Sequence, residues 1–174
     1  MLNMKRLHMI RVRALSAFVL IIALTVAGVN LATPVKAAAG LAPMSSMTPE
    51  QVEAAVEEYF NAVGAHDVQR YVNTFAADGV LEDPVGTPPV QGTTAITGFI
   101  TNIIAPFSEI KAKIQDINVC GNEAAVNWKL QLKTTTNKHI TIDGMGVFSF
   151  NAQGKLQSVR EFWDLAAFLE QLQG

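Results

Sequence analysis

Cysteine is nearly absent from the sequence, since Cys120 is the single one among 174 residues. One thiol excludes an internal disulfide, so the fold must be held by its apolar core, although Cys120 could link two chains. His66 and His139 show no ligand spacing, and the carboxylates form no metal cluster. Because a phosphate-binding glycine loop and a Ser/His/Asp set are also missing, we expect neither a metal nor a cofactor.

Basic residues are scarce after residue 39. Five of the 13 Lys and Arg residues, but none of the 15 Asp and Glu residues, precede position 40. Eight basic and 15 acidic residues therefore remain in the rest of the chain, which gives it a net charge of −7. An acidic chain without a Lys/Arg cluster argues against nucleic acid and against anionic membrane surfaces as partners.

Residues 1–39 have the composition of a secretory signal peptide. A basic segment (1–13) is followed by an uncharged, mostly apolar one (14–29), and Ala37 and Ala39 place small residues before Gly40. An uncleaved membrane anchor is the alternative, because the uncharged stretch 14–35 is 22 residues long. We expect cleavage and export to the periplasm or the medium, with membrane contact only if the segment stays uncleaved. Residues 40–47 are expected to form a flexible tether.

The order of helices and strands in the remaining chain indicates an α+β domain over residues 48–174. A helix start at Thr48-Pro49-Glu50-Gln51 is followed by helical apolar spacing up to Gly64. Further helices are predicted over 66–75, 93–104 and 164–173, and strands over 110–119, 125–133, 140–150 and 155–163. Residues 151–154 have the composition of a hairpin turn. We therefore expect a sheet wrapped over helices.

A carboxylate, Asp83, ends a short strand directly before a stretch rich in proline and glycine, "PVGTPPVQG". An aspartate before proline is usually a turn-former. The alternative is a functional carboxylate that the rigid loop holds in one pose, since a general base must be positioned before its pKa matters.

Several strings resemble the ketosteroid isomerase and SnoaL-like family of the nuclear transport factor 2-like superfamily. They are "EDPVG" at 82–86, "GTTAI" at 92–96, "NEAA" at 122–125 and "FSFNAQGK" at 148–155. Tyr59 and Asp83 also have the family's spacing, and the resemblance covers residues 48 to about 164. It implies a cone-shaped, curved antiparallel sheet wrapped over the N-terminal helices, and a homodimer. Function follows less directly, because such folds host many chemistries as well as plain binding.

The same resemblance assigns roles to two residues and leaves a third role vacant. It implies that Asp83 is the base for proton transfer beside a carbonyl, and that Tyr59 hydrogen-bonds the enolate oxygen. Tyr59 could equally be an ordinary core tyrosine. The family's second donor, a protonated aspartic acid, aligns with Gly146. Asp143 lies at an odd offset from this position, so only a bulge at Gly144 or Gly146 would turn it to the same face.

Glu161 is our candidate for the missing donor. If Phe150 opposes Lys155 across the hairpin, Gly144 opposes Glu161 and Gly146 opposes Val159. The glycines would leave room for the glutamate, whose pKa burial would raise. A salt bridge at the sheet surface is the competing interpretation of Glu161.

The predicted contacts to a small hydrophobic ligand are Trp163, Val159, Trp128, Phe148 and Val85. By default the two tryptophans would be core aromatics. Three functions stay open: cofactor-free proton transfer on a steroid- or polyketide-like carbonyl compound, sequestration of an apolar ligand, and dimerisation through the convex sheet face. The acidic residues of the site distinguish proton transfer from ligand binding. A catalyst needs an ionised Asp83 near a second donor, whereas a binding protein needs only the cavity.

Overall fold

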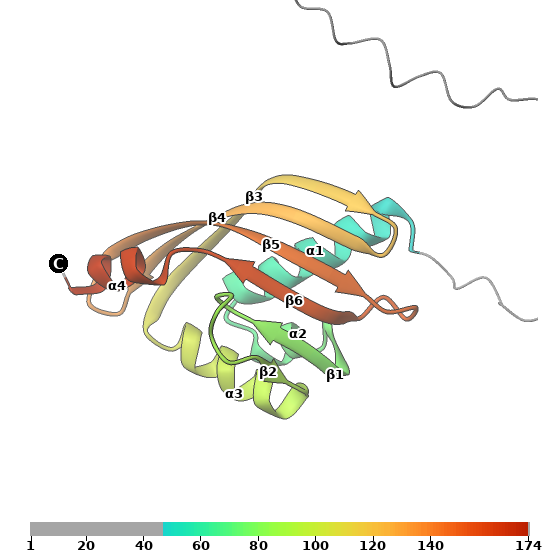
Figure 1. Ribbon diagram of the computed structural model, residues 1–174. Coiled ribbons are helices and arrows are strands. Elements are labelled where there is room, and N and C mark those ends of the chain that lie inside the picture. Colours follow the sequence, from blue (N-terminus) through green and yellow to red (C-terminus); the bar gives the residue numbers. More distant parts are fainter. Residues whose placement is uncertain (1–46, 174) are drawn as a thin grey trace, which may run out of the picture. The chain divides into compact units, whose positions relative to one another are not determined.

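Six strands form one curved sheet in the computed structural model, which describes residues 47–173 (Figure 1). They are β1 (Phe75–Glu82), β2 (Val90–Gln91), β3 (Phe107–Cys120), β4 (Glu123–Thr134), β5 (His139–Phe150) and β6 (Leu156–Phe162), in the spatial order β2-β1-β6-β5-β4-β3. The expected α+β class, with a curved sheet over N-terminal helices, is confirmed. One pairing departs from an antiparallel meander, because β1 runs parallel to β6. The predicted signal segment and residues 40–46 of the tether lie outside the described residues.

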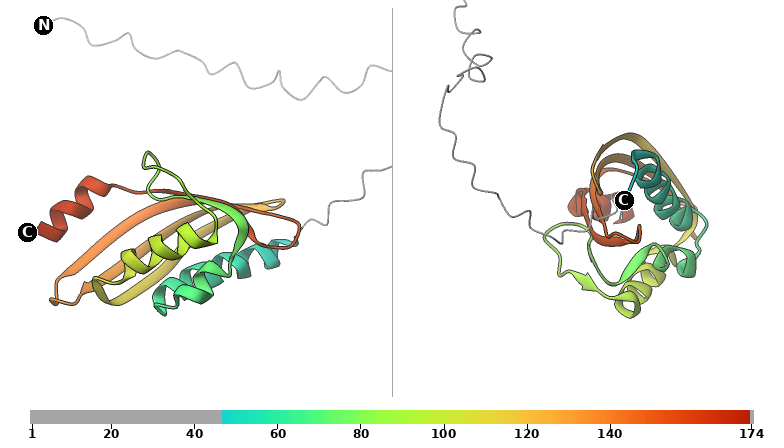
Figure 2. Two further views of the ribbon diagram at one scale, coloured as in Figure 1. Left: turned by 90° about the horizontal axis from the view of Figure 1, so that it is seen from below. Right: turned by 90° about the vertical axis from the view of Figure 1, so that its right-hand side faces the viewer.

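Four helices accompany the sheet: α1 (Pro49–Gly64), α2 (Val68–Val72), α3 (Thr93–Ile104) and α4 (Leu165–Gln173). The sheet curls around the first three, as the end-on view in Figure 2 shows, while α4 lies at the end of the sheet remote from Met47. Met47, the last tether residue, is fixed to the turn between β3 and β4, because its N–H donates to Asn122 Oδ1. Within residues 47–173, no helix combines the length and the apolar character needed to cross a membrane.

The start of α1 is the reciprocal cap that the sequence predicts. The Gln51 N–H donates to the Thr48 hydroxyl (3.3 Å), and the Thr48 N–H donates to the Gln51 side chain (2.8 Å). Val52, Val56 and Tyr59 are buried along one side of the helix. Tyr59 therefore reaches the interior because it belongs to the stripe that packs α1 against the sheet.

The second helix is shorter than its apolar spacing predicts. It ends at Val72, and Phe75 is the first residue of β1 rather than the last of α2. The Thr74 hydroxyl donates to the Tyr71 carbonyl (2.7 Å), while the Thr74 carbonyl accepts from the Leu156 N–H (2.9 Å). Thr74 therefore ends the helix and joins the chain to β6, which the local sequence pattern does not reveal.

The predicted pairing between β5 and β6 is wrong by two residues. Phe148 opposes Val159 and Gly146 opposes Glu161, because the register shifts between Ser149 and Phe150. The turn also includes Lys155, whose carbonyl accepts from the Asn151 N–H (2.8 Å). A slip of two residues preserves the face on which a side chain lies, so Glu161 still points inward. The β4–β5 register is continuous, without the bulge considered for Asp143, and Asp143 forms an ion pair with Lys129.

Two glycines of β5 make room for large inward side chains of the neighbouring strands. A Cβ at Gly144 would lie 2.3 Å from Cζ2 of Trp128, which stands opposite on β4. A Cβ at Gly146 would lie 2.6 Å from Oε2 of Glu161 and 2.5 Å from the Phe148 ring. Both distances are far below van der Waals contact, so the inner face tolerates no side chain at either position.

Gly144→Ala should lower the free energy of unfolding by about 1–3 kcal/mol, because the buried Trp128 ring cannot move aside without strain. The matched control is Gly98→Ala on the exposed side of α3, where an added Cβ meets nothing within 4 Å. It should raise the same free energy by about 0.5–1 kcal/mol through helix propensity. Urea unfolding measures both. A Gly144→Ala protein as stable as the parent would contradict the packing of Trp128 across residue 144.

Candidate active site

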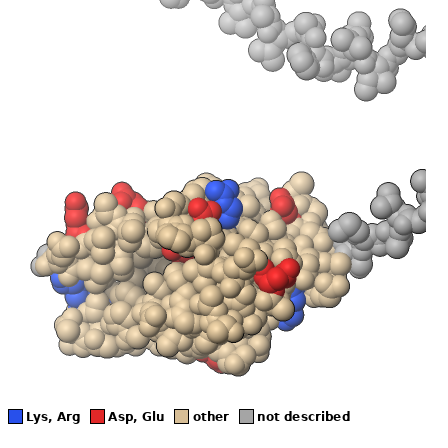
Figure 3. Space-filling view, turned by 60° about the horizontal axis from the view of Figure 1, so that its bottom comes forward, with Lys and Arg blue, Asp and Glu red and all other residues tan. Residues whose placement is uncertain are grey.

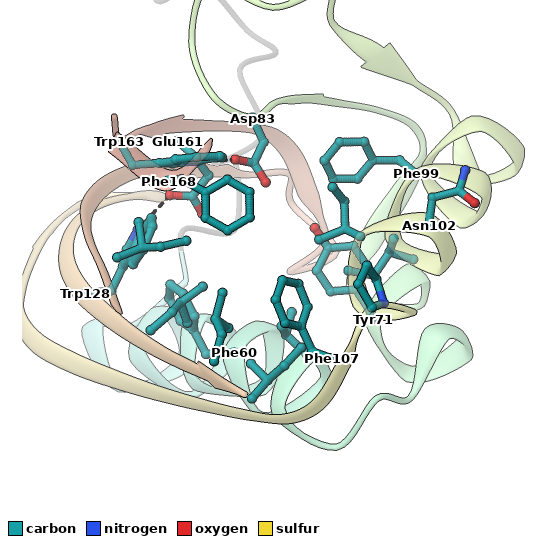
Figure 4. A pocket seen from close by; sticks show the side chains of 18 of the residues that line it. Phe60, Tyr71, Asp83, Phe99, Asn102, Phe107, Trp128, Glu161, Trp163 and Phe168 are labelled. Atoms are coloured by element: carbon teal, nitrogen blue, oxygen red, sulfur yellow. Dashed lines mark hydrogen bonds between the residues drawn. The ribbon is translucent and has the colours of Figure 1, made fainter. Parts of the chain in front are cut away.

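A cavity of about 240 Å³ lies between the concave side of the sheet and the helices. It opens in the hollow of Figure 3, where residues other than Lys, Arg, Asp and Glu form most of the border. Apolar and aromatic side chains dominate its wall, which Figure 4 shows from close by. The lining residues are Tyr59, Phe60, Val63, Tyr71, Asp83, Phe99, Ile100, Asn102, Ile103, Pro106, Phe107, Ile110, Trp128, Leu130, Leu132, Ile142, Glu161, Trp163, Phe168 and Leu172. Such a wall suits a small apolar ligand that carries few polar groups.

Asp83 follows the last residue of β1 and points into this cavity (Figure 4). The Trp163 indole N–H donates to Asp83 Oδ1 (2.5 Å). The loop behind it is fixed to β6, because the Val85 N–H donates to the Glu161 carbonyl (2.7 Å). Burial raises the pKa of Asp83 to about 6, against the lowering effect of the Trp163 hydrogen bond. At neutral pH this carboxyl is therefore mostly ionised and close to its pKa, as a general base should be.

Glu161 is the most deeply buried acid of the site, with 2% of the residue exposed. Its Oε1 accepts from the Tyr59 hydroxyl (3.2 Å) and its Oε2 from the Trp128 indole N–H (2.7 Å). Burial, and then the negative charge of Asp83, raise the pKa of Glu161 to about 8, although both hydrogen bonds act in the opposite direction. The carboxyl is therefore mostly protonated at neutral pH. Within the described part of the chain Glu161 takes part in no salt bridge, and the neighbouring Arg160 pairs with Glu82.

Two tyrosines extend the hydrogen-bonded chain across the wall. The Tyr71 hydroxyl donates to the Tyr59 hydroxyl oxygen (3.1 Å), and the two ring centroids are 4.9 Å apart. Burial is the main cause that raises the pKa of both phenols well above 10. Tyr59 and Tyr71 therefore stay protonated and act only as neutral donors and acceptors.

The number of protons shared by the hydrogen-bonded side chains of Tyr71, Tyr59 and Glu161 decides whether the cavity wall can donate a hydrogen bond to a ligand. Trp128 offers only an N–H donor, so Oε2 of Glu161 must accept, and a neutral Glu161 carries its proton on Oε1. One proton is enough for the contact between Oε1 and the Tyr59 oxygen. The neutral pair therefore has one O–H free for a ligand in the cavity, whereas an ionised Glu161 leaves none.

The residues predicted from the sequence as ligand contacts divide into two groups. Trp128 and Trp163 line the cavity. Phe148 and Val159 are fully buried and lie outside its lining, with the Phe148 ring packed edge-on against Tyr59 at 5.2 Å. Val85 also lies outside the lining, in the loop that fixes Asp83 to β6. These three residues therefore lie outside the cavity wall and belong to the structure that supports it.

The sequence analysis missed Tyr71 and the aromatic residues that α3 and α4 contribute. The contact of Tyr71 with Tyr59 follows only from the packing of α2 against α1. Phe99 and Phe168 belong to amphipathic helices whose orientation the sequence leaves open. The amphipathic spacing of these helices carried no signal for a cavity.

The stability of the domain should fall as the pH rises from about 4 to about 8. The pKa values of Asp83 and Glu161 are both raised in the folded state, to about 6 and about 8, so folding retains protons that the unfolded chain releases in this window. Glu161→Gln should flatten this slope, with a gain on the order of a few kcal/mol at pH 8–9 relative to the parent. Urea unfolding between pH 4 and pH 9 measures it, with exposed Glu57→Gln as the control. An unchanged slope in Glu161→Gln would contradict a neutral buried Glu161.

Known proteins resemble this chain in sequence and in fold. The steroid Delta-isomerase of Nocardioides simplex is 26% identical over 113 residues, which cover 65% of this chain and 89% of that protein. The structure of SalBIII, an epoxide hydrolase/cyclase-like enzyme in pyran ring formation in the polyether salinomycin, matches with a TM-score of 0.62 and 25% identity, over 70% of this chain and 97% of that one. A model of the SnoaL-like domain matches residues 56–159, more than half of the chain, and the protein therefore belongs to this family within the nuclear transport factor 2-like superfamily.

Proposed function

We propose that the protein catalyses cofactor-free proton transfer next to the carbonyl group of a small hydrophobic compound of steroid or polyketide type. The observation that carries the proposal is the pair of carboxyl groups in one apolar cavity, with the pKa of Asp83 at about 6 and that of Glu161 at about 8. At neutral pH such a pair provides one ionised and one protonated acid. The steroid isomerase relative makes proton transfer the reaction to test first.

The reaction would proceed in two balanced steps. The Asp83 carboxylate removes a proton from the carbon next to the carbonyl, and the electron pair moves towards the carbonyl oxygen to give an enolate. The free O–H of the Tyr59–Glu161 pair hydrogen-bonds this oxygen, where the negative charge develops. Asp83 then returns the proton to a different carbon, so the product is a double-bond isomer of the substrate and both acids regain their initial state.

A binding protein without catalysis is the second candidate. Eight aromatic residues line the cavity, and such a wall would hold an apolar ring system whether or not any proton moves. The acid at position 161 also departs from the family pattern, in which the corresponding acid aligns with Gly146. The two candidates differ in whether bound ligand is converted.

Asp83→Asn should abolish the isomerisation of a β,γ-unsaturated ketosteroid, followed by the ultraviolet absorbance of the conjugated product. Removal of a general base lowers kcat/KM by about 10²–10⁴-fold. Asp143→Asn is the matched control, because Asp143 is an exposed aspartate paired with Lys129 on the other face of the sheet. It should leave the rate unchanged. No turnover by the parent protein, together with tight binding of the conjugated product, would favour the binding protein.

The pH dependence of kcat/KM should be bell-shaped. Activity should rise through a pKa of about 6 as Asp83 ionises, and fall through a pKa of about 8 as Glu161 loses its proton. Glu161→Gln, whose amide does not titrate, should lose the alkaline limb, and its rate at neutral pH should fall by up to about 10²–10³-fold because the donor is weaker. Full activity and an unchanged profile in Glu161→Gln would exclude a role for the Glu161 proton.

We also propose export, which rests on the composition of residues 1–39. The intact mass of protein recovered from an exporting bacterial host should correspond to a chain that begins at Gly40. A full-length mass in the membrane fraction would instead indicate the uncleaved anchor.

A further inference from the structure

Trp163 connects the base to the C-terminal helix. It stands between β6 and α4, and its indole N–H donates to Asp83 Oδ1 (2.5 Å). The other side of the connection is Phe168 in the first turn of α4, whose ring meets the indole edge-on with centroids 5.6 Å apart and an interplanar angle of 86°. Among the described residues, Phe168 is the one aromatic side chain that packs against the Trp163 ring. Figure 4 shows these two rings beside Asp83.

The helix that carries Phe168 is capped at its start and tied to the sheet near its end. At its start, the Ala167 N–H donates to Asp164 Oδ1 (2.9 Å). Towards its end, Gln171 exchanges two hydrogen bonds with the backbone of Thr141 (3.0 and 3.1 Å), and Lys138 Nζ donates to the Leu172 carbonyl (2.7 Å). The contacts of Gln171 and Leu172 tie α4 to β5 and to the turn before it, so the Phe168 ring is presented to Trp163 from a fixed support.

We infer that Phe168 is a positioning residue for Asp83, which it orients through the Trp163 indole. A tryptophan ring rotates about two side-chain bonds, and its N–H reaches Oδ1 only when the plane of the indole is correct. The T-shaped arrangement of the Phe168 ring and the indole selects that plane. A leucine of similar size would fill the space without this preference. The assignment of Asp83 as the base rests on the proposed function, whereas the link from Phe168 to the Asp83 carboxyl does not.

Phe168 could act on the pKa of Asp83 in two opposite directions, and an experiment can distinguish them. The Trp163 hydrogen bond lowers the pKa of Asp83, whereas burial, to which α4 contributes as part of the cavity wall, raises it. If Phe168 positions the indole, its loss should raise the pKa of Asp83. If Phe168 only keeps water out, its loss should lower it. The other titratable groups near Asp83 are Glu161 on β6, Tyr59 on α1 and Tyr71 on α2, with Asp164 next to Trp163, and they are the same in every variant.

The experiment is a carboxyl ¹³C NMR titration of Asp83 in the ligand-free full chain, which needs no substrate. Phe168→Leu should shift the pKa of Asp83 upward from about 6, in the same direction as Trp163→Phe. In a double variant that carries both Phe168→Leu and Trp163→Phe, the pKa of Asp83 should equal that in Trp163→Phe alone, because both changes remove the same hydrogen bond. The chain has two tryptophans, so the Trp163 indole N–H is one of only two such signals and should move in Phe168→Leu.

The controls separate positioning from general damage. Phe168→Tyr keeps the aromatic edge and should titrate like the parent, as should Leu169→Ala, which truncates the neighbouring outward side chain of α4. Urea unfolding checks that each variant is folded, and Phe168→Met is the substitute if Phe168→Leu is not. An unchanged or lowered pKa of Asp83 in the leucine or methionine variant would overturn the inference. A parent protein without isomerase activity would overturn the proposed function and leave this test intact.

Discussion

Burying the carboxyl group of Glu161 is the requirement around which the inner face of the sheet is arranged. An acid in this position loses its hydration and is tolerated only when hydrogen bonds replace the lost water and when it can remain neutral. Trp128 and Tyr59 provide those bonds from β4 and α1. Gly146 provides the space, and Gly144 provides the space for the indole that makes one of the bonds. Two helices and three strands therefore meet at a single acid, with Tyr71 of α2 as the outermost contributor.

The two acids of the cavity differ because they stand on different kinds of backbone. Glu161 is part of a central strand, lies opposite Gly146 of β5, and accepts hydrogen bonds from Trp128 of β4 and Tyr59 of α1. Asp83 lies where β1 ends, with a single side-chain donor. The same burial therefore shifts the pKa of Glu161 further than that of Asp83, and the negative charge of Asp83 adds to the difference. The fold sets the distinction between base and donor before any ligand binds.

Sequence alone predicted the features that depend on neighbouring residues. The cap at Thr48 follows from local spacing, whereas the inward face of Glu161 was implied by the family resemblance, and the structure has both. The pairing of Gly146 with Glu161 could not be obtained this way, because it depends on the turn at Asn151 and on the register shift beside Phe150. Contacts between remote segments, such as β1 beside β6 or Tyr71 beside Tyr59, depend on tertiary packing and leave no periodic trace. The family resemblance indicated Tyr59 and Asp83, but it carried no information on an acid that stands on a different strand.

The close approach at Gly146 has a consequence for the history of the site. Positions 146 and 161 are direct neighbours across β5 and β6, and a Cβ at 146 would collide with the carboxyl of Glu161. The cavity therefore has room for one buried acid from these two strands but not for two. A lineage that moves the acid from 146 to 161 by single substitutions must pass through a protein that is either crowded or lacks the acid. The second acid can therefore change strands without crowding, and without being lost on the way, only if positions 146 and 161 are substituted together.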